Sequence, residues 1–263
     1  MIVVTGATGN VGRPLMELLG DKARGVSRPQ VDLARPSTLE PVLDGADALF
    51  LLFAGDLLGP SADVAGVLDV AKAAGVRRVV LLSSQGAGTR PGLVPHSRMA
   101  SFEEAVRQSS LEWTILRPSG FFTNTFAWVR PIREHGVAAA PFADVALPFV
   151  DPADIAAVAA VALQGGHEGR TYVLTGPEAL TPVERTKALS SAIGREIRFV
   201  EQSVEEAREQ MLQFMPPPVV DGTLAVLGSP TVEEQQVSGH VEQVTGRAPA
   251  RFADWVARNV NAF

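Results

Sequence analysis

The residues Thr5-Gly6-Ala7-Thr8-Gly9-Asn10-Val11-Gly12 decide the fold, because they join an apolar run directly to a helical pattern. Gly6 permits a tight turn, and Gly9 lets backbone N–H groups approach an anion without a Cβ in the way. Gly12 lets the helix pack close to the strand. The N-terminus of that helix offers unpaired donors and positive potential to a diphosphate. The stretch predicts a dinucleotide-binding strand–loop–helix unit; the alternative is a turn of purely structural use.

The same order of apolar run and helical pattern recurs along the chain. Runs typical of strands are Ile2–Thr5, Ala23–Ser27, Ala48–Phe53, Val79–Ser83, Glu112–Arg117 and Arg170–Thr175. Helical spacing is found at Val11–Leu19, Ser61–Ala74 and Ser97–Gln108, with Gly20 and Gly75 placed as C-terminal caps. Strands that alternate with helices predict a parallel sheet with right-handed crossovers. The expected fold class is α/β, a Rossmann-type doubly wound parallel sheet.

One crossover departs from this plan. Only a few residues separate Ala23–Ser27 from Val31-Asp32-Leu33, whereas a helical crossover needs about a dozen residues. The helix between the second and third strands is therefore expected to be missing or vestigial.

The second half combines scaffold with a smaller appendage. Phe121–Glu134 is expected to form a helix interrupted near Pro131. Capping residues predict helix starts at Asp151, Thr181, Ser203 and Thr231, with Gly194 closing the second of these helices. We expect a dinucleotide-binding domain over residues 1–175 and a small, mainly helical substrate cap over residues 176–263. No Gly/Ser-rich linker separates the two, so hinge motion should be limited.

Composition narrows the class of protein. The 263 residues carry a formal net charge of −6 and include no cysteine. This excludes disulfides and thiolate zinc sites, and no metal site is expected. The acidic balance argues against nucleic-acid binding. The lack of a signal-peptide pattern and of an apolar run of about 18 residues predicts a cytoplasmic protein that does not bind membranes. The chain is expected to be a monomer or a homodimer.

Four further motifs follow the glycine-rich loop and extend over nearly the whole chain. They are Val79-Val-Leu-Leu-Ser-Ser-Gln85, Glu112-Trp-Thr-Ile-Leu-Arg-Pro-Ser-Gly-Phe-Phe-Thr-Asn124, Phe149-Val-Asp-Pro-Ala-Asp-Ile155 and Val244-Thr-Gly-Arg-Ala-Pro249. With the loop, these motifs resemble the NmrA-like branch of the atypical short-chain dehydrogenase/reductase superfamily. The resemblance implies a Rossmann fold and a nicotinamide cofactor. It does not specify the substrate, because the family includes quinone reductases, ketone reductases and cofactor-sensing regulators.

The position about 20 residues past the loop bears on the choice of cofactor. NAD-preferring folds carry an acidic residue there, whereas this chain has Ser27-Arg28 and no carboxylate before Asp32. The guanidinium groups of Arg28 and Arg13 suit a 2′-phosphate, which favours NADP(H); the alternative is that both are solvated surface arginines. By the resemblance, Asp32 lies beside the adenine and Leu33 packs on its ring. The alternative for Asp32 is a turn or capping residue.

The resemblance also implies the other contacts to the cofactor. The backbone of Pro118-Ser119-Gly120-Phe121 would face the nicotinamide carboxamide, since ligands bind at the carboxyl ends of such strands. The expected cofactor-binding residues are Gly6, Thr8, Gly9, Asn10, Val11, Gly12, Arg13, Ser27, Arg28, Asp32, Leu33, Phe53, Ala54, Ser83, Pro118, Ser119, Gly120 and Phe121.

The usual catalytic set of short-chain reductases cannot be built from this sequence. That set is a serine, a tyrosine that protonates the carbonyl, and a lysine four positions later that lowers the tyrosine pKa. The single tyrosine, Tyr172, lies in a strand without a nearby lysine, and the family pattern places Pro95 and Met99 at the tyrosine and lysine sites. Only a serine, Ser83 or Ser84, remains.

A weaker proton donor suffices for some substrates. The reduced oxygen of a quinone or an activated aromatic ketone is a stabilised, phenol-like anion, whereas a simple aliphatic ketone needs a strong donor. Candidate donors are Ser84, which could instead satisfy backbone groups at its strand end, and His96, which could instead be a surface loop histidine. The other histidines, His135, His167 and His240, are expected to be solvated.

The substrate wall is expected after the fifth strand and in the cap. Phe121, Asn124, Thr125 and Trp128 share one helix face, and Phe122, Phe126 and Val129 share another; either face could line the cleft or pack in the core. Methionines adapt to planar apolar ligands. The expected substrate-contacting residues are Gln85, Phe122, Asn124, Trp128, Met211 and Phe214. An aromatic pocket with few charges suits a flat, poorly charged aromatic substrate.

These expectations favour an NADPH-dependent reductase that transfers hydride to a carbonyl of a quinone or an aromatic, polyketide-like ketone of secondary metabolism. The absence of the tyrosine–lysine pair supports one alternative, a non-catalytic NADP(H)-sensing regulatory protein that binds a protein partner. A sugar-nucleotide epimerase or lyase is disfavoured, because those enzymes also use the missing tyrosine.

Overall fold

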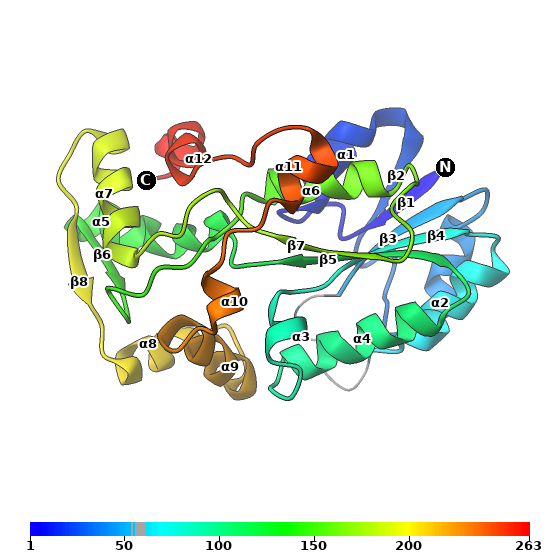
Figure 1. The fold of residues 1–263 in the computed structure, drawn as a ribbon, viewed down its shortest axis with the longest axis horizontal. Coiled ribbons are helices and arrows are strands. Elements are labelled where there is room, and N and C mark those ends of the chain that lie inside the picture. The colour runs from blue at the N-terminus through cyan, green and yellow to red at the C-terminus, as the bar shows by residue number, and fades with distance from the viewer. Residues whose placement is uncertain (54, 56–61) are drawn as a thin grey trace.

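A six-stranded parallel sheet forms the centre of the molecule, in a computed structural model that describes residues 1–53, 55 and 62–263 (Figure 1). The strand order is β2-β1-β3-β4-β5-β7. The bounds are β1 Ile2–Thr5, β2 Ala23–Val26, β3 Ala48–Leu52, β4 Arg78–Leu82, β5 Glu112–Pro118 and β7 Arg170–Leu174. All pairings in this sheet are parallel, which confirms the doubly wound α/β fold predicted from the sequence.

Helices cover both faces of the sheet (Figure 1). One face carries α1 Gly12–Leu19, α6 Pro152–Ala162 and α11 His240–Thr245, and the other carries α2 Val64–Ala73, α3 Gly86–Thr89 and α4 His96–Gln108. Successive residues of a strand point to opposite faces. In β3, Phe50 packs with the α1/α6 cluster while Leu49 and Leu51 pack with the α2/α4 cluster. Burial on both faces explains why these strands are apolar runs without alternation.

The crossover from β2 to β3 contains no α-helix, as predicted. A 3-10 helix, η2 (Pro36–Val42), takes its place, with Pro41 inside it. Val31 and Leu33 lie outside any strand but are buried against α2. Because β3 pairs with β1 on the side opposite β2, the order of the sheet reverses at β1. The carboxyl ends of the strands at such a reversal form the ligand crevice of doubly wound sheets.

The part of the molecule beyond the carboxyl ends of the strands, called the substrate-side part below, comprises residues 122–147 and 177–235 and contains a small sheet that the sequence did not predict. Strand β6 (Val137–Ala140) pairs in parallel with β8 (Arg198–Glu201). Three alanines in β6 carry little β-propensity, so packing rather than local preference selects the strand. The expected boundary at residues 175/176 stays a prediction, and this pairing ties residues on its two sides together. The other helices are α5 Val129–His135, α7 Pro182–Ile193, α8 Val204–Met211, α9 Pro217–Gly228, α10 Val232–Gln235 and α12 Phe252–Asn259, with short 3-10 helices η1 Gly20–Lys22, η4 Phe122–Trp128 and η5 Val260–Ala262.

The predicted capping residues are confirmed. Asp151 accepts a hydrogen bond from Ala153 N–H at the start of α6. Full capping boxes, in which side chain and backbone bond reciprocally, open α7 at Thr181, α8 at Ser203 and α10 at Thr231.

The predicted helix over Phe121–Glu134 was wrong in type. Its first half is the 3-10 helix η4, and an α-helix, α5, begins only at Val129. Phe122 N–H donates to the carbonyl of Val150, which holds the start of this segment against the chain before α6. Pro131 lies in the first turn of α5, where the missing N–H has no intrahelical partner to lose. Among the helices of the described residues, none is long and apolar enough to cross a membrane.

Candidate active site

The glycine-rich loop has the shape that a diphosphate requires. Gly6 has φ +67°, in the left-handed region that favours glycine, and Gly9 N–H donates to the Gly6 carbonyl at 3.0 Å. A Cβ on Gly12 would lie 2.1 Å from that same carbonyl oxygen, so only glycine fits there. No side chain of the described residues caps α1, and its first turn contains no carboxylate. The positive end of α1 is therefore available to an anion, and these residues fit a bound dinucleotide.

A cavity of about 280 Å³ adjoins this loop. It extends from the loop to the segment after β2, and its lining residues are Thr5, Gly6, Thr8, Gly9, Val26, Ser27, Arg28, Val31, Leu33 and Leu52. The structure thus brings Ser27, Arg28 and Leu33 to the same cavity as the loop. Arg13 lies on the other side of the loop, where its guanidinium contacts the Thr8 carbonyl at 3.5 Å.

Asp32 does not line this cavity but holds the turn that follows it. Its carboxylate accepts from Ala34 N–H at 3.1 Å and from Arg35 Nε at 3.0 Å. These hydrogen bonds, first the one from the Ala34 backbone, lower the pKa of Asp32 below its usual value. The capping alternative is the role that the structure shows, and the contact to adenine stays a prediction.

A buried charge cluster lies directly behind the end of β4. Glu103 of α4 is fully buried, and its carboxylate accepts a two-pronged pair of bonds from Arg117 at 2.8 and 2.6 Å. Arg107 and the hydroxyl of Ser83 donate to the same carboxylate at 2.7 and 2.5 Å. Burial alone would raise the pKa of Glu103, but the bonds from Arg117 and Ser83 lower it below its usual value. Ser83 is therefore committed to Glu103, which leaves Ser84 as the serine that faces the cleft.

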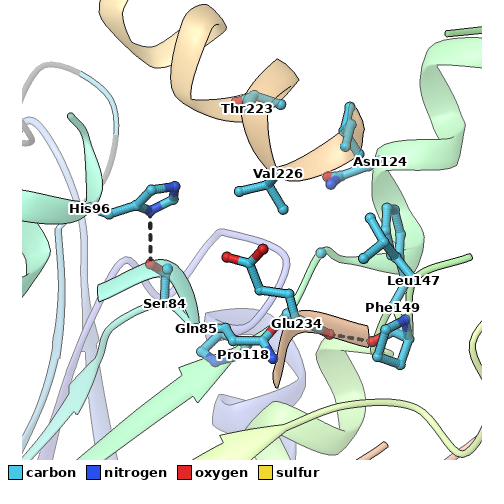
Figure 2. A pocket seen from close by; sticks show the side chains of 15 residues that line it. Ser84, Gln85, His96, Pro118, Asn124, Leu147, Phe149, Thr223, Val226 and Glu234 are labelled. Carbon is cyan, nitrogen blue, oxygen red and sulfur yellow. Dashed lines mark hydrogen bonds between the residues drawn. The ribbon is translucent and has the colours of Figure 1, made fainter. Parts of the chain in front are cut away.

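A second cavity, of about 220 Å³, lies at the carboxyl ends of β4 and β5. Figure 2 shows its side chains, which come from both the Rossmann part and the substrate-side part. The wall is apolar toward Leu147, Phe149 and Val226 and polar toward Ser84 and His96. The lining residues are Ser84, Gln85, Gly86, His96, Pro118, Ser119, Gly120, Asn124, Leu147, Pro148, Phe149, Thr223, Val226, Leu227 and Glu234. The predicted residues Ser84, His96, Gln85, Asn124, Pro118, Ser119 and Gly120 are all among them.

Ser84 and His96 lie side by side in this second cavity (Figure 2). Ser84 Oγ is 3.5 Å from His96 Nδ1. His96 Nε2 is buried and has no hydrogen-bond partner among the described residues. A Cβ on Gly86 would lie 2.2 Å from His96 Nδ1, so glycine at this position makes room for the imidazole. Burial lowers the pKa of His96, which is neutral at pH 7 and half-buried rather than a surface residue.

Helix α10 forms part of the wall of this cavity through Glu234. Glu234 is buried, and its carboxylate accepts from Arg90 Nε at 2.8 Å and from Thr89 Oγ1 at 2.6 Å. The amide of Gln85 donates to the Glu233 carbonyl at 3.0 Å. These bonds fasten α10 to α3 and fix the position of this wall. The Thr231…Glu234 pattern predicted only a helix start, so this second role of Glu234 was missed.

Several predicted contacts are placed elsewhere. Phe122 and Trp128 are buried in a cluster with Phe252 and Trp255 and do not line either cavity described above. Their helix is a 3-10 helix, whose side chains fall on faces other than those expected for an α-helix. Phe53 is also core, with its ring 4.7 Å from that of Phe102.

The two predicted substrate contacts in the cap do not line the second cavity. Phe214 is 69% exposed, and Met211 packs with Ala207 and Leu224 away from the cavity.

The other predicted cofactor-binding residues have varied positions. Ala54 lies outside the described residues. Thr8 lines both the cavity beside the glycine-rich loop and a further hollow beside α6. Asn10 faces that hollow, and its Nδ2 donates to Thr123 Oγ1 at 3.3 Å. Val11 is buried in the core cluster between the sheet and α6, and Phe121 is partly buried against the same cluster.

The remaining histidines are not simply solvated. His167 bonds to the hydroxyl of Tyr172 at 2.8 Å, and His240 bonds to the backbone of Val173. Both are half-buried beside the single tyrosine, and neither lines the cavity that contains Ser84. His135 is exposed, as expected.

Comparison with known proteins places this architecture in a family. The sequence model described as NAD(P)H-binding matches residues 20–164. The chain is 38% identical to the (4-alkanoyl-5-oxo-2,5-dihydrofuran-3-yl)methyl phosphate reductase of Streptomyces griseus, covering 100% of this chain and 99% of the relative. It is 31% identical to the NAD(P)H azoreductase of Xenophilus azovorans, with the same coverage.

A solved structure matches the fold. The NADPH-dependent quinone oxidoreductase of Escherichia coli, complexed with NADPH, superposes with a TM-score of 0.80 over 99% of each chain at 24% identity. The glycine-rich loop, the reversal of strand order at β1 and the match to the NAD(P)H-binding family all indicate a dinucleotide ligand. The chain therefore belongs to the NAD(P)H-binding family and is an oxidoreductase whose cofactor is NAD(P)H.

Proposed function

We propose that the protein is an NADPH-dependent reductase that transfers hydride to a carbonyl of a quinone or an aromatic ketone. One observation carries the proposal: the second cavity sets an apolar wall, Leu147 and Phe149, opposite the neighbouring donors Ser84 and His96. A flat conjugated compound fits such a wall, and its carbonyl would meet the donors. The names of the relatives from Streptomyces griseus and Xenophilus azovorans describe reductases of a furanone phosphate and of azo compounds, which supports reduction of a conjugated acceptor.

The residues of the cavity would perform three tasks. The bound cofactor supplies the hydride. The segment Pro118–Gly120 would hold the nicotinamide end, since Ser119 Oγ donates to the Pro148 carbonyl and Val150 N–H donates to the Gly120 carbonyl at 2.8 Å, which fixes its backbone. His96, oriented by Ser84, would give a hydrogen bond from Nε2–H to the substrate oxygen; its protonated form, which takes the extra proton from solvent, would give that oxygen a proton and return to the neutral imidazole. The apolar wall would exclude water and hold the ring of the substrate against the nicotinamide.

The preference for NADPH should depend on Arg28. It lines the cavity beside the glycine-rich loop, where a guanidinium suits a 2′-phosphate. We expect Arg28→Gln to raise KM for NADPH about tenfold and to leave KM for NADH nearly unchanged. Steady-state kinetics with both cofactors measures this. Arg35→Gln is the matched control, because Arg35 lies in the same segment but does not line this cavity. Equal effects of Arg28→Gln on both cofactors would contradict the assignment.

The proton donor should be detectable by substitution. We expect His96→Gln to lower kcat about 10²-fold with an aromatic ketone and about tenfold with a quinone, whose reduced oxygen is the more stable anion. Ser84→Ala should lower kcat about tenfold, because the imidazole loses its neighbour. Single-turnover oxidation of NADPH measures the step directly. Undiminished rates in both variants would leave the proton to solvent or to the substrate.

The dependence of this rate on pH has a definite sign. Because burial lowers the pKa of His96 below 6.5, it gains its second proton only below that pH. The charged form is the stronger acid, so kcat should rise as the pH falls through the lowered pKa. This rise should be absent in His96→Gln, and a rise of equal size in the variant would assign it to another group.

The activity itself is tested by following NADPH absorbance with a panel of quinones and aromatic ketones. Turnover of at least one class is the expected result. Tight binding of NADPH with no turnover of any compound, and with a clear preference for one redox state, would instead favour the sensor alternative.

A further inference from the structure

Arg185 is a buried cation that lacks a polar partner among the described residues. It lies in α7, is 8% exposed, and its Nε has no hydrogen-bond partner among the described residues. Its guanidinium is instead placed over two rings, 4.4 Å from the centroid of Phe149 and 5.1 Å from that of Trp128. No carboxylate of the described residues forms an ion pair with it, and burial lowers its pKa to about 10, so it stays charged at pH 7.

Such a group opposes folding. Buried charges are normally paired, because desolvation of an isolated ion is costly, and aromatic faces offset only part of that cost. An apolar side chain of similar length would fill the same space without the penalty. A charge kept at the expense of stability points to a role in function, and a cation calls for an anion.

The position of Arg185 connects it to the substrate cavity. Phe149, which the guanidinium covers, is part of the cavity wall, and Trp128 follows the lining residue Asn124 by four positions in η4. The cation therefore lies one side chain behind the apolar wall.

The remaining charge at the wall is neutralised. Glu234 is the single charged residue among the described residues that line this cavity, and Arg90 pairs with it at 2.8 Å. Thr89 Oγ1 and the backbone N–H of Thr231 also donate to its carboxylate. This leaves Arg185, directly behind the wall residue Phe149, as a positive charge without a carboxylate partner among the described residues. A ligand stacked on the far face of Phe149 would lie about 8 Å from it, where a unit charge at an effective dielectric of about 20 changes binding about tenfold or more.

From this arrangement we propose that Arg185 makes the cavity selective for a substrate that bears an oxyanion, a carboxylate, sulfonate or phosphate group, at the end bounded by Phe149. This inference rests on the proposed function and names the substrate class more closely. It also revises the expectation of a poorly charged substrate, since the sequence does not reveal that Arg185 is unpaired.

The first test compares a neutral quinone with its anionic counterpart, 1,4-naphthoquinone and 1,4-naphthoquinone-2-sulfonate. In Arg185→Met we expect the ratio of kcat/KM for the sulfonate to kcat/KM for the neutral quinone to fall about tenfold, or about 1.4 kcal/mol. Arg185→Lys should retain most of the ratio. Arg130→Met, a substitution of an arginine that is exposed on α5, is the control and should leave the ratio unchanged. An unchanged ratio in Arg185→Met would overturn the proposal.

The second test needs no turnover. Calorimetry with NADP⁺ present would compare naphthalene-2-sulfonate with the neutral naphthalene-2-sulfonamide. We expect the wild-type protein to prefer the sulfonate and Arg185→Met to lose that preference. If this holds while no quinone is reduced, the proposed function fails and the anion site stands; if the preference is absent from the wild type, the anion site fails. The third arm of the test is inorganic phosphate alone. If free phosphate binds as tightly as naphthalene-2-sulfonate, the site binds anions in general, and this result would contradict selectivity for an anionic group carried by the substrate.

Thermal unfolding separates a functional charge from a structural one. If Arg185 serves the ligand, Arg185→Met should unfold at the same temperature as the wild type or higher. A fall of several degrees together with an unchanged selectivity ratio would show that the cation only joins the Trp128 and Phe149 rings.

Discussion

Gly12→Ala should abolish cofactor binding and destabilise the fold at the same time. The new Cβ would lie 2.1 Å from the Gly6 carbonyl oxygen and 2.8 Å from the Ala7 Cα, both backbone atoms that cannot turn aside as a side chain would. Helix α1 must then move away from the loop, and the N–H groups at its start lose their alignment with the diphosphate. We expect a loss of about 3 kcal/mol of unfolding free energy and a Tm lower by about 10 °C.

Two alanine variants separate the loop's shape from its contact with the cofactor. A Cβ on Gly9 would lie 3.3 Å from the Gly6 carbonyl, so Gly9→Ala should fold almost normally yet bind NADPH at least about tenfold more weakly. Gly92→Ala should change neither property, since a Cβ there meets nothing within 4 Å. Thermal unfolding and calorimetry with NADPH measure the two effects. Normal NADPH affinity in Gly12→Ala would disprove the assignment of the loop.

Glu103→Ala should destabilise the fold strongly. It removes a fully buried carboxylate and leaves the Arg117 guanidinium, bound to it at 2.6 Å, without its partner. Breaking one side of such a buried pair costs about 3–5 kcal/mol. Because Arg117 lies just before Pro118–Gly120, the segment expected at the nicotinamide, KM for NADPH should rise as well. Glu104→Ala is the control. The carboxylate of Glu104 is exposed, so this substitution should lower the free energy of unfolding by less than about 0.5 kcal/mol.

The stabilising effect of Glu103 depends on pH in one direction. Its pKa in the folded protein lies below the usual 4.5, so its contribution is complete above pH 4.5 and is lost as the pH falls through the lowered pKa. The difference in unfolding free energy between wild type and Glu103→Ala should therefore shrink in acid. Urea unfolding at pH 7 and at successively lower pH measures it. A constant difference down to pH 3 would show that ionisation of Glu103 is not the cause.

Local chemistry explains which parts of the structure could be predicted from the sequence. Glycine spacing predicted the loop, and the pairs Thr181/Glu184 and Ser203/Glu206 predicted helix starts, because capping depends on residues only three positions apart. That Ser84 and His96 lie near each other could also be predicted from the sequence, because Ser84 lies just after β4 and His96 begins the next long helix, only twelve positions later.

Features that depend on distant partners were out of reach. Glu234 bonds to Arg90 across 144 positions, and its local pattern already had a complete interpretation as a helix cap. Arg185 reads as an ordinary solvated helix residue, because only the folded chain shows that aromatic rings rather than carboxylates surround it. Phe122 and Trp128 were misplaced because the type of helix sets which side chains share a face, and the sequence favoured the wrong type.

The pairing of β6 with β8 constrains how this protein can be recombined with its relatives. In the sequence, β6 precedes β7 and β8 follows it. The two strands pair with each other in parallel, from Val137 opposite Arg198 to Ala140 opposite Glu201. A chimera that exchanges parents once, after β7, would join β6 of one ancestor to β8 of another. Transplanting substrate preference intact therefore requires two exchanged segments, one that includes residues 137–140 and one that begins after residue 175.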